Sequence, residues 1–99
     1  MSSLVWKTQQ SVTEALTLYH KAANAGHGFS QLILATKYQH GDDLPRDYVK
    51  AYKYANMAYK SAQNESDKEA ALGLRDSIFA KMSDEEKRVY LSLLTDNKP

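Results

Sequence analysis

Cysteine is absent from the 99-residue sequence, which excludes disulfide bonds and thiolate ligands or nucleophiles. The sequence has no large excess of either charge, because it contains 13 Lys and Arg residues and 12 Asp and Glu residues, which give a net charge of +1. Nucleic-acid-binding proteins usually carry a basic excess, so we expect no nucleic-acid partner. The sequence has no apolar run of roughly 20 residues and no signal-peptide pattern at its start, so we expect a cytoplasmic protein without membrane insertion.

Residues that break helices or favour strands are also scarce. There are two prolines and four glycines, and valine and isoleucine are few, whereas Ala, Leu, Lys, Gln and Glu are frequent. This balance favours helices over sheet. Apolar residues recur at the helical period of three and four residues, and they predict an all-α chain with helices near 11–25, 28–40, 47–62, 66–81 and 83–94.

Capping residues mark the ends of these helices. Serine followed three residues later by glutamate is the capping-box pattern, which occurs at Ser11, Ser66 and Ser83. Asp47 is placed to cap the helix that follows it. Two glycines stand where a left-handed residue would end a helix, namely Gly26 and Gly41.

The predicted caps also indicate an internal repeat. Ser11, Asp47 and Ser83 are spaced by 36 residues, and at the same offset Ala15 and Ala22 meet Ala51 and Ala58. A fixed period of this length is the signature of stacked two-helix units. Such units bury their apolar faces only against their neighbours, and alanines allow the helices to approach closely.

The segment 15–26 and the residues that follow it resemble the Sel-one-like repeat (SLR) family, a relative of the tetratricopeptide repeat. The resemblance covers about residues 12–62 and implies a short α-solenoid of antiparallel helix pairs, with about five helices and two and a half repeats. Asp43 departs from the family pattern, because a second loop glycine is usual there. The positions that we assign to the repeat are Ala15, Tyr19, Ala22, Gly26, Leu34, Ala35, Tyr38, Gly41, Asp47, Ala51 and Ala58.

We expect residues 1–99 to form a single domain of such repeats. Its expected parts are a leader at 1–10, a half repeat at 11–26, a full repeat at 27–62, a divergent capping pair at 63–94 and a tail at 95–99. Two alternatives remain for the open end of the first unit. Either Leu4, Val5 and Trp6 fold back over it as a plug, or it pairs with a second copy in a homodimer.

Candidate residues for chemistry do not form a recognisable site. His20, His27 and His40 have no zinc-motif spacing, and we expect them at the surface or at helix ends. Asp42 and Asp43 lie in a segment that lacks the pattern of a calcium-binding loop. Phosphate-binding and nucleophile motifs are absent from the sequence as well. We therefore predict no catalytic, cofactor-binding or metal-binding residues, and no enzymatic activity.

Tyrosine is common, with seven residues. Tyr48, Tyr52 and Tyr59 form a stripe on the third predicted helix. Such a stripe is either core packing or an exposed aromatic surface that anchors a partner, and both readings stay open.

In the family, the first helix of each unit lines the concave wall, which here is the helix at 28–40. With Leu34, Ala35 and Tyr38 turned to the core, the opposite side of that helix carries Phe29, Ile33, Thr36, Lys37 and His40. An apolar pair with a basic rim is typical of a protein-binding patch. We expect a non-catalytic adaptor or scaffold that binds a protein or peptide there. The alternative is a small inhibitor or immunity-type protein that blocks a partner enzyme.

Overall fold

The computed structural model describes residues 9–96, and this part of the chain is built from helices without strands. The helices are α2 (Gln9–Asn24), α3 (Gly28–His40), α4 (Tyr48–Ser61), α5 (Glu65–Lys81) and α6 (Asp84–Asp96). The five helices predicted from the periodicity are thereby confirmed, with every end within two residues. No helix in the described range is long and apolar enough to cross a membrane.

Several helix ends are made by the residues that the sequence indicated. Asp47 caps α4, because its Oδ1 accepts a hydrogen bond from the backbone N–H of Lys50 at 3.0 Å. Ser83 and Glu86 form the complete capping box of α6, with hydrogen bonds of 3.1 and 2.8 Å. Gly41 ends α3 with a left-handed φ of 69°, and a Cβ there would lie 3.3 Å from Arg46. A glycine is therefore required at this turn.

Two predicted caps are wrong. Ser11 lies inside α2, which begins at Gln9, and Ser66 lies inside α5. Asn64 caps α5 instead, because its Oδ1 accepts from the N–H of Asp67 at 2.8 Å. Asparagine caps a helix as well as serine does, and Asn64 lies two residues before Ser66, so the helix begins earlier than predicted.

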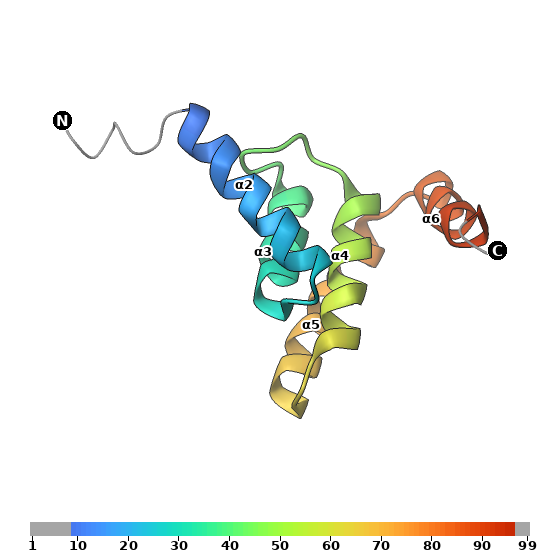
Figure 1. Ribbon diagram of the computed structural model, residues 1–99. Coiled ribbons are helices and arrows are strands. Elements are labelled where there is room, and N and C mark those ends of the chain that lie inside the picture. Colours follow the sequence, from blue (N-terminus) through green and yellow to red (C-terminus); the bar gives the residue numbers. More distant parts are fainter. Residues whose placement is uncertain (1–8, 97–99) are drawn as a thin grey trace.

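The helices stack in sequence, and α4 is the central element (Figure 1). It packs against both α3 and α5, while α2 packs on α3 and α6 packs on α4. The buried apolar core runs through these contacts and comprises Ala23, Leu34, Ala35, Tyr38, Ala51, Tyr54, Ala55, Ile78 and Met82. The chain thus forms the short α-solenoid that the repeat implied.

One end of this stack differs from the expected packing. Ala15 is exposed and Ala22 is only half-buried, although both were expected at close helix crossings. Among the described helices, α2 packs mainly against α3, whereas the equivalent helix α4 packs against both α3 and α5. The proposed plug of Leu4, Val5 and Trp6 lies outside the described residues.

Candidate functional site

The two sides of α3 have opposite character. Leu34, Ala35 and Tyr38 face the core, with exposed fractions of 0%, 0% and 7%. Phe29 lies on the opposite side and is 68% exposed. An aromatic side chain in this position presents a large apolar surface to a partner.

The predicted patch residues lie on this outer side of α3. Thr36 and His40 are exposed, while Ile33 and Lys37 are half-buried. An open hollow of about 330 Å³ brings four of the five together, and its lining is Phe29, Leu32, Ile33, Thr36, Lys37 and Asp42. His40 does not line this hollow.

A second hollow, of about 360 Å³, lies at the other end of α3. It is lined by the α2–α3 turn, the start of α3, the end of α4 and the start of α5. Its lining residues are Gly26, His27, Gly28, Phe29, Leu32, Ala58, Ser61, Ala62, Gln63 and Asp67. Phe29 and Leu32 line both hollows, so the two adjoin each other, and we call them together the α3 trough.

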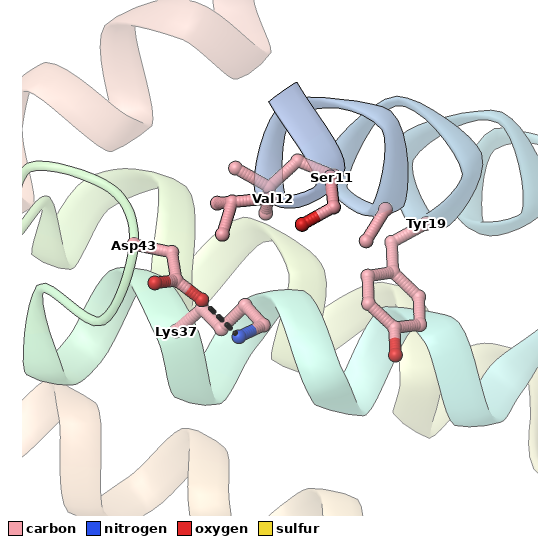
Figure 2. A pocket seen from close by; sticks show the side chains of 7 residues that line it. Ser11, Val12, Tyr19, Lys37 and Asp43 are labelled. Atoms are coloured by element: carbon pink, nitrogen blue, oxygen red, sulfur yellow. Dashed lines mark hydrogen bonds and ion pairs between the residues drawn. The ribbon is translucent and has the colours of Figure 1, made fainter. Parts of the chain in front are cut away.

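Lys37 does not provide the free basic rim that the sequence suggested. Its Nζ lies 3.0 Å from Oδ2 of Asp43 and 3.8 Å from Oδ2 of Asp42, and only 19% of its side chain is exposed. Asp43 has a positive φ of 66°. It occupies the position at which the repeat usually has a second loop glycine. This left-handed residue is part of the turn that returns the chain towards α3, where its carboxylate meets Lys37 (Figure 2).

A smaller hollow of about 220 Å³ lies on the α2 side of this ion pair. Ser11, Val12 and Tyr19 of α2 line it together with Lys37 and Asp43 (Figure 2). Lys37 therefore lines both this hollow and the α3 trough.

His20 belongs to an aromatic cluster that helical periodicity did not reveal. Its Nδ1 donates to the carbonyl of Leu16 at 2.8 Å, and its Nε2 lies 3.0 Å from the hydroxyl of Tyr38. The Tyr38 ring stacks on Tyr54, with 5.9 Å between the ring centroids. Burial is the main cause that raises the pKa of both tyrosines. His20 is thus half-buried rather than at the surface, whereas His27 caps α3 and His40 is exposed.

A third surface feature is a groove of about 430 Å³ between α4, the end of α5 and α6. Tyr52 of α4 contacts Tyr90 of α6 edge to face, with ring centroids 4.7 Å apart. At the 36-residue offset of the repeat, Leu91 and Leu94 of α6 correspond to Ala55 and Ala58 of α4, which are buried. These leucines are 60% and 48% exposed. The helix α6 packs on α4, and Nζ of its Lys87 lies 4.3 Å from the ring centroid of Phe79 in α5.

The tyrosine stripe of α4 serves mainly as packing. Tyr48, Tyr52 and Tyr59 are all half-buried. Arg75 of α5 lies over the Tyr59 ring at 5.0 Å and donates to Oδ1 of Asn56 at 2.9 Å. These contacts join α4 to α5.

Within residues 9–96, no three His, Asp or Glu side chains are grouped so that they could hold a metal ion.

Comparison with known families identifies the repeat. The Sel1 repeat model matches residues 7–27 and 28–62, which is more than half of the chain. The chain belongs to the Sel1 repeat family. Sel1 repeats are helical solenoid units that generally act as protein–protein interaction modules and are typically non-catalytic. No curated protein and no solved structure matches the chain.

The Sel1 matches agree with the architecture. The second match begins at residue 28, where α3 begins, and ends at residue 62, just after α4. The pair α3 and α4 is therefore one complete Sel1 repeat, and the outer side of its first helix carries the α3 trough. The helices α5 and α6 lie beyond the matched residues.

Proposed function

We propose that this Sel1 repeat protein is a non-catalytic adaptor that binds a protein or peptide on the concave helical face, at the side of α3 that is turned away from the core, which we call its outer face. The surface comprises Phe29, Ile33, Thr36, Lys37 and His40. The observation that carries this proposal is Phe29, which is 68% exposed and lines two adjoining hollows on a helix whose other side is buried in the core. Exposed aromatic side chains beside apolar hollows are the usual anchors of protein interfaces.

The test begins with a partner identified by affinity purification and then purified separately. Binding to the wild type is compared with binding to Phe29→Ala. We expect Phe29→Ala to weaken binding by about tenfold or more, as for an anchor residue, while the unfolding curve stays unchanged because the ring is exposed.

Phe79→Ala is the matched control, because Phe79 is also an exposed phenylalanine, at 44%, and lines the groove beside α6. We expect it to bind the partner like the wild type. Loss of binding in Phe79→Ala with full binding in Phe29→Ala would instead assign the interface to the α6 groove. Equal binding by all three proteins would refute the α3 surface.

An inhibitor or immunity-type protein could use the same face of α3. The reconstituted complex separates the two roles when the partner is an enzyme. An inhibitor abolishes the partner's turnover at stoichiometric amounts, whereas an adaptor leaves it intact and joins the partner to a further protein.

The exposed side of α2 is the proposed place for a second copy. Leu18 is 64% exposed there, and Ala15 beside it is exposed too. Light scattering tests this proposal directly, because a mass equal to that of one chain at high concentration excludes a stable homodimer.

A further inference from the structure

We infer that the segment bound in the α3 trough carries an apolar side chain flanked on both sides by basic residues. This inference rests on the proposed function and specifies the chemistry of the partner. It follows from the charges and the dimensions of the trough.

The centre of the trough is apolar. Phe29 and Leu32 line both hollows, and Ile33 lies beside them in the first. A polar group placed over these side chains would lose its contact with water and find no hydrogen-bonding side chain among them. The central position of the bound segment therefore favours an apolar residue.

Both ends of the trough are acidic. Asp42 lines one end and its side chain is 64% exposed, while Asp67 lines the other end and is exposed as well. Lys37 is the cation in the lining, and its charge is already shared between Asp42 and the closer Asp43. Lys37 is paired with Asp43, which lies outside the lining, so the carboxylates of Asp42 and Asp67 leave the trough with an excess of negative charge. The trough is therefore complementary to a cationic segment rather than an anionic one.

The length of α3 indicates how long the bound segment is. Phe29 and Lys37 are eight residues apart on the helix, which corresponds to about 12 Å at 1.5 Å per residue. An extended peptide rises about 3.3 Å per residue and covers this distance in about four steps, with alternate side chains on one face. A segment of about five residues therefore covers the length of trough between these two residues. With an apolar residue at its centre and a basic residue at each end, its long basic side chains extend towards the acidic ends of the trough.

The test uses three synthetic peptides that share Gly-Ser flanks and differ only in the central five residues. The first contains Arg-Ser-Phe-Ser-Arg, the second Glu-Ser-Phe-Ser-Glu and the third Arg-Ser-Ser-Ser-Arg. Each is titrated into the full-length, isotope-labelled protein while amide chemical shifts are followed. We expect the first peptide to shift amides of residues 28–42 and 63–67 and to bind at least tenfold more tightly than either of the others.

Protein variants test whether the carboxylates of Asp42 and Asp67 cause the preference for the arginine peptide. Asp42→Asn and Asp67→Asn are each expected to weaken the first peptide about two- to fivefold, because exposed charge pairs contribute modestly. Asp76→Asn is the matched control, since Asp76 is also an exposed acid, at 70%, and lines neither hollow. It should leave the affinity unchanged.

The outcomes separate this inference from the proposed function. Equal binding of the arginine and glutamate peptides, or equal affinity of all three aspartate variants, would overturn the basic pattern. If a purified partner still required Phe29 in that case, the proposed interface would stand. If neither the peptides nor the partner shifted amides of α3, both proposals would be wrong.

Discussion

Replacement of the buried leucine of α3 tests the packing of the solenoid. Leu34 is 0% exposed, and the change Leu34→Ala removes the equivalent of three carbon groups from the core. At about 0.8 kcal/mol for each buried group, the lost transfer energy is about 2.4 kcal/mol. The remaining cavity adds about 24 cal/mol per Å³, so we expect a loss of about 3–4 kcal/mol in the free energy of unfolding.

Leu18→Ala is the matched control for this experiment. It makes the same chemical change inside another helix, but Leu18 is 64% exposed, so we expect an effect within about 0.5 kcal/mol. Urea unfolding followed by circular dichroism at 222 nm gives both values. For Leu34→Ala the melting temperature should also fall by roughly 12–30 °C. Equal losses in the two variants, or an unchanged midpoint for Leu34→Ala, would refute the assignment of the core.

Two further changes test buried polar groups. Gln31 is 1% exposed; its Nε2 donates to the carbonyl of Ala23, while its Oε1 has no hydrogen-bond partner. Because Gly26 also donates to that carbonyl, Gln31→Leu should be neutral or stabilising by up to about 1 kcal/mol in urea unfolding, and a loss above about 2 kcal/mol would contradict this. Burial raises the pKa of Tyr38 and Tyr54 above 10.0 in the folded state, so unfolding releases protons at alkaline pH. Stability should therefore fall as the pH rises past about 10, and the fall should be shallower in Tyr38→Phe; equal slopes would contradict this.

Most of the fold could be predicted from local patterns. The side-chain oxygens of Asp47 and Ser83 cap helices by accepting hydrogen bonds from backbone N–H groups three residues later. Both partners of each cap are therefore visible in the local sequence. The start of α5 shows where this reasoning fails, because Asn64 and Ser66 are both good caps and local pattern alone does not rank them. The positive φ of Gly41 was predictable from residue type.

The candidate site was predicted only in outline. Helical geometry places Phe29 and Ile33 on one face, which the sequence showed directly. The ion pair of Lys37 depends on a loop in which Asp43 adopts a positive φ, and residue type alone rarely predicts that for aspartate. The contact between His20 and Tyr38 joins residues 18 apart on different helices, so no periodic signal could reveal it.

The position of α3 explains why its outer face is available. The core side of the helix is covered by α2 and α4, which supply the packing that orders it. The opposite side has only limited contact with α5 in the described chain, so Phe29 stays exposed. A rigid helix held in this way presents its surface residues with little loss of conformational entropy on binding.

Amide hydrogen exchange of the purified complex tests the central claim most directly. The claim is that the partner binds the outer face of α3. We predict added protection at residues 28–42 and 63–67, with α6 exchanging as in the free protein. Protection confined to residues 84–94, with unchanged exchange in α3, would contradict the account.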